Sequence, residues 1–211
     1  MKKGLIIGSG EIRNLHKLKH EHINHDFIIC ADGGVKHCVA MGLSIDLVIG
    51  DLDSISESQL SYVSEKGIPI QKYPTEKDET DLEIALTYLV ENNFEMITMM
   101  GVTGNRLDHS LANIFLLKKL NNKQVFGRII DDNNIIYYLE GKLQIPKQSK
   151  YLSVIPLSDR GVIVSLEGVY YPLNKKHISF GSTLGISNEI NEEYAQIEIH
   201  SGGALIIESE D

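Results

Sequence analysis

The chain has 211 residues, of which 42% are hydrophobic and 23% charged, a composition typical of an ordinary globular protein with one large or two small domains. Its formal net charge of -9 and the lack of a basic run argue against nucleic-acid binding, because affinity for a phosphate backbone needs clustered Lys and Arg. An acidic protein can still bind a polyphosphate where a metal ion mediates the contact.

The cysteines and the apolar runs bear on the compartment. Cys30 and Cys38 form no C-x-x-C motif, so neither a disulfide framework nor a zinc site is predicted. The apolar run Leu5-Ile6-Ile7 is too short for the core of a signal peptide, and no stretch is long enough to span a bilayer. We therefore expect a reduced, cytoplasmic protein with no membrane partner.

The first part of the chain alternates strand-like apolar runs with helical segments, which is typical of a parallel sheet. Buried strands are expected at 4–7, 27–31, 47–49 and 96–100, and a helix at 35–41. In such sheets the ligand crevice lies outside the carboxyl ends of the strands. Gly8-x-Gly10, after the first strand, is only a weak phosphate motif because the third glycine of a dinucleotide fingerprint is missing.

Asp51 and Asp53 directly follow the third expected strand. On an extended chain residues i and i+2 point to the same side, so we expect both carboxylates to face one small volume. Like charges held together repel, and a divalent cation such as Mg²⁺ is the usual compensation. Asp32 ends the second strand at the same edge. The alternative is a solvated turn, in which Asp and Ser are common.

A second acidic group, Asp78 and Asp81, lies at the start of a helix for which Thr80-x-x-Glu83 predicts a capping box. The expected apolar face of that helix comprises Leu82, Ala85, Leu86, Leu89 and Val90. Acidic residues at a helix N-terminus also favour the helix dipole. Two interpretations therefore remain, a dipole effect and a metal site shared with the aspartates after the third strand.

The loop after the strand at 96–100 combines glycines with Arg106, Asp108 and His109. Glycines allow close backbone approach, and Arg suits phosphate. His109 either belongs to a binding site or lies in the first turn of a helix, where a neighbouring group satisfies its hydrogen bonds. The helix that follows is expected to bury a set of apolar side chains, namely Leu107, Leu111, Ile114 and Phe115.

The helical pattern ends near residues 131–134. Short β-rich runs follow at 135–139, 151–155, 162–166, 195–199 and 204–207. Repeated short strands with turns predict an antiparallel sandwich. We expect an α/β domain at residues 1–133 with a mainly parallel sheet, followed by an all-β sandwich at residues 134–211.

Taken together, these motifs resemble the thiamine pyrophosphokinase family. The matching stretches are Ala31–Gly34, Ile49–Ser54, Lys77–Glu83, Gly104–His109 with Asn113, and Gly185–Glu189. Each is weak alone, but the ordered set is specific and spans most of the chain. The resemblance implies a dimeric enzyme that uses Mg²⁺ to transfer the pyrophosphoryl group of ATP to the hydroxyl of thiamine. The sandwich domain would help to bind thiamine.

The resemblance also implies roles for individual residues. The metal ligands would be drawn from Asp32, Asp51, Asp53, Asp78 and Asp81. The catalytic residues would be Asp51, Asp53, Asp81 and Arg106. The nucleotide-binding residues would be Gly33, Gly34, Lys77, Arg106, His109 and Asn113. The thiamine-binding residues would be Asp108, Ser187 and Asn188, lining a site shared between the two chains of a homodimer. The general base remains open among the aspartates.

Two positions and one missing residue type depart from the family pattern. Asn105 replaces the second glycine of the usual Gly-Gly-Arg loop, and Ile186 stands where Thr is common. The chain has no Trp, so any stacking on thiamine must come from Tyr or Phe.

Two other functions stay open at this point. One is a metal-dependent nucleotide-sugar transferase that uses Asp51-x-Asp53, which would leave Gly104–His109 and Ser187-Asn188 without a role. The other is a non-catalytic sensor of thiamine or a nucleotide.

Overall fold

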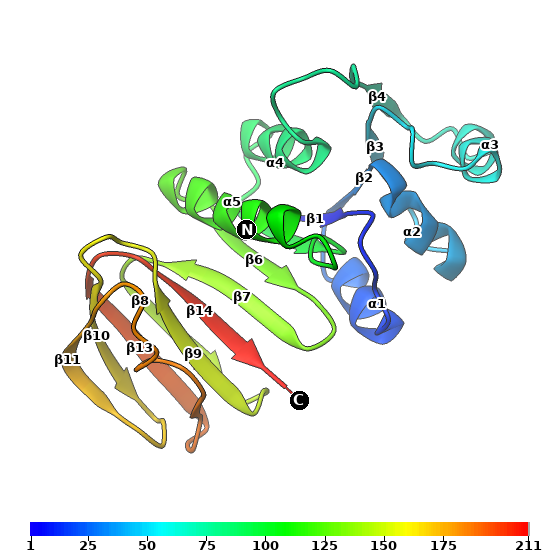
Figure 1. Ribbon diagram of the computed structural model, residues 1–211. Coiled ribbons are helices and arrows are strands. Elements are labelled where there is room, and N and C mark those ends of the chain that lie inside the picture. The colour runs from blue at the N-terminus through cyan, green and yellow to red at the C-terminus, as the bar shows by residue number, and fades with distance from the viewer. Residues whose placement is uncertain (211) are drawn as a thin grey trace. The chain divides into compact units, whose positions relative to one another are not determined.

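The structure, a computed structural model, describes residues 1–210, and the chain divides into two compact units, Met1–Asp132 and Asn133–Asp211 (Figure 1). Within residues 1–210, no helix is long and apolar enough to cross a membrane.

The first unit is built on a parallel sheet. Its strands are β1 (Lys3–Ile7), β2 (Phe27–Ala31), β3 (Leu47–Gly50), β4 (Ile70–Lys72), β5 (Met96–Met100) and β6 (Phe126–Ile130). They lie in the order β6-β5-β1-β2-β3-β4, and every neighbouring pair is parallel. The predicted parallel sheet is confirmed. The chain order reverses beside β1, which makes the ends of β1 and β5 a topological switch point.

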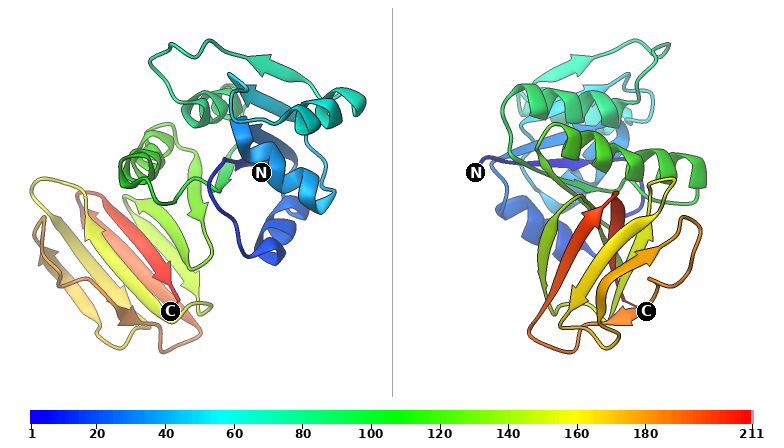
Figure 2. Two further views of the ribbon diagram at one scale, coloured as in Figure 1. Left: turned by 45° about the vertical axis from the view of Figure 1, so that its right-hand side comes forward. Right: turned by 90° about the vertical axis from the view of Figure 1, so that its left-hand side faces the viewer.

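Helices cover both faces of this sheet. They are α1 (Leu15–Ile23), the 3₁₀ turn η1 (Asp32–Gly34), α2 (Val35–Met41), α3 (Glu57–Glu65), α4 (Asp81–Glu91) and α5 (Leu107–Asn122). Figures 1 and 2 show α1 and α2 on one face and α4 and α5 on the other. Strands covered on both faces need apolar side chains throughout, and Ile6, Ile29 and Ile97 are accordingly inaccessible to solvent.

Of the capping box predicted at the start of α4, the bond to the Thr80 side chain forms, whereas the Glu83 side chain bonds to another helix. The Thr80 hydroxyl accepts a hydrogen bond from the Glu83 amide at 3.2 Å, as the N-cap of a capping box does. The Glu83 carboxylate is 2.8 Å from the Lys119 ammonium of α5, so it is engaged in an ion pair between helices. The expected apolar face is buried at Leu82, Ala85, Leu86 and Leu89 and half-buried at Val90.

The prediction for the buried face of α5 was wrong. Leu107, Leu111 and Phe115 are 68%, 43% and 51% exposed, and Ile114 is only half-buried. Leu117 and Leu120 are buried instead, packed over Gly127 of β6. A methyl group at Gly127 would lie 2.5 Å from Leu120 Cδ1, so the missing side chain admits these leucines and fixes the rotation of the helix.

The second unit is an antiparallel sandwich, as predicted. Its strands are β7 (Asn134–Leu139), β8 (Lys142–Pro146), β9 (Tyr151–Pro156), β10 (Val162–Glu167), β11 (Leu173–Ile178), β12 (Asn188–Glu189), β13 (Tyr194–Ser201) and β14 (Ala204–Ser209). One sheet contains β12-β9-β14-β7 and the other β11-β10-β13-β8 (Figure 2). Val154 and Ile206 of the first sheet share a buried core with Val164 and Ile197 of the second.

Candidate active site

The first unit holds a cavity of about 530 Å³, within the size range of small-ligand sites. Its walls are the loops after β1, β2, β3, β4 and β5 and the first turns of α4 and α5. These loops follow the carboxyl ends of parallel strands, where the sequence predicts the ligand crevice.

Three aspartates meet at this edge. Asp32, Asp51 and Asp53 each offer a carboxylate oxygen, and these atoms lie within 4.8 Å of one another. From the sequence we expected Asp51 and Asp53 to pair along an extended chain. The structure brings them together in a different way. Leu52 has a φ of 72°, and the Asp53 amide donates to Asp51 Oδ1 at 3.1 Å, so a tight turn brings the two carboxylates together.

The backbone around the cluster adopts sparsely populated conformations. Asp32 has a φ of 48° and Gly50 a φ of 149°. A methyl group on Gly50 would lie 3.2 Å from both Asp32 Cβ and Asp81 Cγ. Glycine therefore permits the turn and leaves room for the acidic side chains around it.

The charges of the cluster fit a divalent cation. Asp32 Oδ1 is buried and has no hydrogen-bond partner within residues 1–210, as expected of a metal ligand. Burial raises the pKa of Asp81, and the neighbouring Asp51 and Asp32 push it the same way, against the lowering effect of Lys77. A bound metal ion would relieve this crowding of negative charge.

The two Lys or Arg residues that line the cavity are each paired with a carboxylate. Lys77 Nζ lies 3.0 Å from Asp81 Oδ1 and donates to the Pro74 carbonyl at 2.9 Å. Arg106 Nε and Nη2 lie 3.1 and 2.5 Å from the two oxygens of Asp108. Arg106 and the His109 amide hold the pKa of Asp108 far below its ordinary value.

The other expected nucleotide residues fall into two groups. His109 and Asn113 line the cavity, and the Asn113 amide donates to the Val102 carbonyl at 2.7 Å. Gly33 and Gly34 are buried behind it, and a methyl group on Gly34 would lie 1.9 Å from the Ile7 carbonyl. Gly34 is thus required for packing η1 on the end of β1.

The remaining expected residues lie outside the cavity lining. Asp78 and Asp108 are exposed, and Ser187 and Asn188 belong to the second unit. Asn188 is buried, and its amide group accepts from the Tyr171 N–H at 3.0 Å and donates to the Tyr171 carbonyl at 2.8 Å.

Sequence reasoning missed several lining residues, among them Ser9, Gly10 and Thr103. The weak motif Gly8-x-Gly10 was the signal for Ser9 and Gly10, and Thr103 lies in the glycine-containing loop that the sequence singled out only for its Arg, Asp and His.

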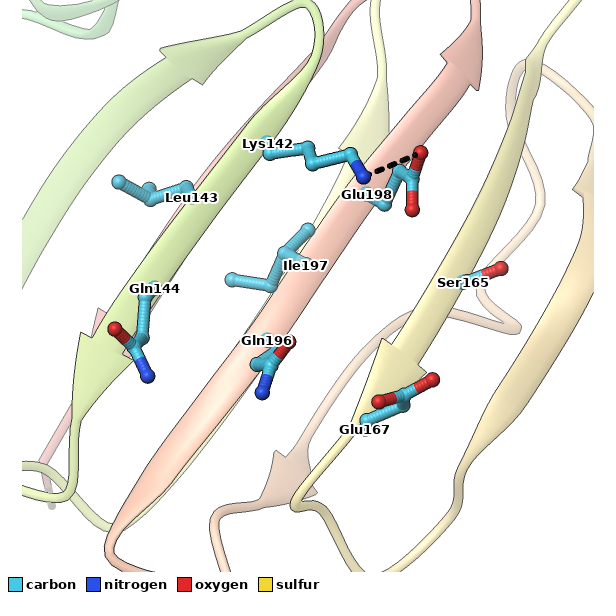
Figure 3. A pocket seen from close by; sticks show the side chains of 8 residues that line it. All are labelled: Lys142, Leu143, Gln144, Ser165, Glu167, Gln196, Ile197 and Glu198. Atoms are coloured by element: carbon cyan, nitrogen blue, oxygen red, sulfur yellow. Dashed lines mark ion pairs between the residues drawn. The ribbon is translucent and has the colours of Figure 1, made fainter.

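A second hollow, of about 250 Å³, lies over β8, β10 and β13 of the second unit (Figure 3). Its polar side chains are spread along three strands, and Lys142 pairs with Glu198 at 3.2 Å. Within residues 1–210, the aspartate cluster is the one group of at least three side chains suited to a metal ion. This hollow is therefore not the candidate active site.

Fold and site define an α/β protein with an acidic, metal-compatible cavity at the carboxyl edge of a parallel sheet. Two family models match the chain, "Thiamin pyrophosphokinase, catalytic domain" over residues 18–126 and "Thiamin pyrophosphokinase, vitamin B1 binding domain" over residues 140–204. The chain belongs to the thiamin pyrophosphokinase family.

Individual relatives agree with this assignment. Thiamine pyrophosphokinase of Bacillus subtilis is 35% identical over 190 residues, covering 89% of each chain. The crystal structure of thiamine pyrophosphokinase from Bacillus subtilis superposes with a TM-score of 0.91 at 32% identity, with full coverage of both chains. That from Geobacillus thermodenitrificans gives a TM-score of 0.84 at 30% identity, covering 100% of this chain and 98% of the other.

Proposed function

We propose that the protein is a thiamine pyrophosphokinase, which converts ATP and thiamine to AMP and thiamine diphosphate. The thiamine hydroxyl oxygen bonds to the β-phosphorus of ATP, and the bond from that phosphorus to the α-phosphate oxygen breaks. The hydroxyl proton passes to a base. The observation that carries the proposal is the aspartate cluster at the cavity, two members of which, Asp32 and Asp51, line it, in a chain of this family.

The metal in this proposal is Mg²⁺, held by Asp32, Asp51, Asp53 and Asp81. Oxygen ligands of this kind suit Mg²⁺, which neutralises phosphate charge when bound. We assign Asp32 in preference to Asp78, because Asp32 shares the cluster and has a buried carboxylate oxygen without a partner, whereas Asp78 is exposed.

In this proposal the side chains around the aspartate cluster bind ATP. Lys77 and Arg106 are the cavity-lining cations and offset the phosphate charge. Arg106 is bonded to Asp108 in the free protein. When the nucleotide binds, Arg106 turns to the phosphates or contacts both groups. His109 and Asn113 contact the nucleotide from the first turns of α5, while Gly33 and Gly34 shape the backbone behind it.

Thiamine is assigned to the second unit together with Asp108. Asn188 holds the backbone of Tyr171 through two hydrogen bonds, and Tyr171 is 65% exposed. Its centroid lies 4.8 Å from that of Tyr170, edge to face. A fixed, exposed aromatic pair provides a stacking surface in a chain without Trp, so Tyr171 binds the thiamine ring while Asn188 and Ser187 shape the pocket.

The protein is further proposed to act as a homodimer with shared sites. Leu107, Leu111 and Phe115 form an exposed stripe along α5, starting next to Arg106. In the second unit the apolar side chains of Phe180, Leu184 and Ile186 are exposed close to Ser187 along the chain. Apolar surface of this kind needs a cover, and a second copy supplies it with twofold symmetry.

The proposed location is the cytoplasm. The Sγ atoms of Cys30 and Cys38 are buried 3.7 Å apart as free thiols, which suits a reducing compartment.

Release of AMP from ATP, measured with and without thiamine, tests the function. The proposed kinase gives AMP only with thiamine and equimolar thiamine diphosphate. A nucleotide-sugar transferase gives no thiamine-dependent AMP, and a sensor binds without turnover. Either of the last two results contradicts the proposal, and metal-depleted protein serves as the blank.

A further inference from the structure

The loop that joins β1 to α1, residues 8–14, forms one wall of the cavity. Its residues 8–10 line the cavity beside Asp32 and Asp51. Because those aspartates would hold a metal ion that neutralises phosphate charge, we expect this loop to face the phosphate end of the nucleotide. Its position therefore matters to the reaction although it carries no charged group at residues 8–10.

One side of the loop is packed directly on the backbone of the β5–α5 loop. The Gly10 amide donates to the Gly101 carbonyl at 2.7 Å. Methyl groups added at Gly8 and Gly10 would lie 2.5 and 2.6 Å from that same oxygen. Only glycines allow this contact, so the spacing Gly8-x-Gly10 has a packing cause.

The other side is held by the first turn of α2. His37 Nε2 lies 2.7 Å from the Gly10 carbonyl, and the neighbouring Lys36 Nζ donates to the Ser9 carbonyl at 2.5 Å. A carbonyl only accepts, so His37 donates from Nε2. Lys36 is exposed, whereas His37 is 9% exposed, and a buried bond constrains the loop more strongly.

The same short helix is joined to the aspartate cluster. Asp32 opens η1, and α2 follows η1 without a break. The contact of Gly34 with the Ile7 carbonyl presses this junction onto the end of β1. One rigid element thus carries a cluster aspartate at its start and the bond to the cavity loop in its first turn.

We propose that His37 is a positioning residue, whose bond to Gly10 fixes the β1–α1 loop against the aspartate cluster and so sets the wall that the ATP phosphates meet. His37 does not line the cavity, so it acts through Gly10. The proposal rests on the proposed function for its kinetic consequence, but the placement of the loop is a property of the free protein.

The kinetic experiment compares His37→Leu, which cannot donate, with His37→Gln, whose amide nitrogen can replace Nε2. His37→Leu is expected to raise the KM for ATP about tenfold, within the ~100-fold that a misplacement of about 1 Å can cost. The KM for thiamine should change less than about twofold. His37→Gln should recover most of the loss. His22→Leu is the matched control, because it removes a histidine bond of 2.8 Å to the Ser44 carbonyl away from the cavity.

A second measurement needs no activity. Hydrogen exchange of the amides at residues 8–14 in the ligand-free protein should be faster in His37→Leu and native in His37→Gln. If wild-type protein makes no thiamine diphosphate, the proposed function fails, and exchange still decides the role of His37. If His37→Leu does not fold, His37→Asn replaces it, since its amide is too short to reach Gly10. The proposal would be overturned if a variant without the bond kept the hydrogen-exchange protection of the loop and the ATP KM of the wild type. It would also be overturned if His37→Gln and His37→Leu changed these two quantities equally.

Discussion

Asp51 and Asp53 are the residues on which the metal role depends most directly. Asp51→Asn or Asp53→Asn should lower kcat at least about 100-fold, on the order of 3 kcal/mol of transition-state stabilisation, because each removes a charged ligand. Both side chains follow a strand rather than fill the core, so the melting temperature should stay near that of the wild type. Steady-state kinetics over a range of Mg²⁺ concentrations checks this, with the exposed Asp159→Asn as control. Near-native turnover at ordinary Mg²⁺ would remove the metal role from that residue.

Arg106 is bonded to Asp108 in the free protein, so the effect of removing it depends on whether it turns to phosphate. If Arg106 turns from Asp108 to phosphate, Arg106→Ala should raise the KM for ATP about tenfold or more and leave thiamine binding nearly unchanged. Arg106→Lys should recover only part, because Lys lacks the planar fork. The KM values of the two substrates provide the comparison. Equal weakening of both would indicate that Arg106 only orders the loop.

Tyr171 offers a residue-scale test of the thiamine assignment. Tyr171→Ala should raise the KM for thiamine about fivefold, as expected from the loss of about 1 kcal/mol of stacking, while Tyr171→Phe should stay close to wild type. The KM for ATP should not move in either variant. Tyr194→Ala, an exposed tyrosine on β13, is the matched control. A thiamine KM unaffected by Tyr171→Ala would place the stacking surface elsewhere.

Among the elements, α1 is attached to the sheet through a buried polar network that makes stability depend on pH. His25 Nδ1 donates to the Glu21 carbonyl at 2.6 Å, and Nε2 lies 2.8 Å from the Thr98 hydroxyl of β5. Arg128 of β6 donates to the same hydroxyl at 3.1 Å and pairs with the Glu21 carboxylate at 2.6 Å. Burial lowers the pKa of His25 below its ordinary value of 6.5, against the opposing pull of Glu21.

The sign of the effect follows from that direction. Because the folded pKa lies below the unfolded one, the unfolded state binds the proton more readily. The contribution of neutral His25 is complete above about pH 6.5 and is lost as pH falls through the folded pKa. Urea unfolding at about pH 7.5 and about pH 5.5 should show a smaller loss of unfolding free energy in His25→Gln than in the wild type. An equal loss in both proteins would show that His25 does not titrate on unfolding.

At the scale of the whole molecule, the shared-site proposal makes a prediction about mixtures. Asp51→Asn and Asn188→Ala remove residues from different units of the chain. If each site uses the first unit of one chain and the second unit of its partner, a mixed dimer has up to one intact site. Activity should therefore reappear when the two inactive variants are mixed, and dimers should be seen by analytical ultracentrifugation. After verified subunit exchange, a persistently inactive mixture would mean that each chain builds its own site.

The sequence by itself was enough to predict the two architectures and to identify most of the acidic residues that gather at the strand ends. The strands at 27–31 and 96–100 and the helix at 35–41 are found with the predicted bounds, because buried strands and caps leave local patterns in the chain. The sandwich strands with alternating apolar residues were equally visible. β8, β11 and β12 were not predicted, because β11 is largely polar, β12 has two residues, and β8 offers only Leu143 and Ile145 as alternating apolar residues before Pro146.

Only the tertiary structure decided which surfaces and groups meet. The apolar residues of α5 fit more than one buried face, and the gap over Gly127 in β6 selected Leu117 and Leu120. The aspartates come together through a left-handed backbone at Leu52, which no residue preference announces. His37 and Asn188 each bond to a backbone group 27 or 17 residues away. Sequence periodicity records what one element needs locally, whereas contacts of this kind depend on where the sheet places the ends of separate elements.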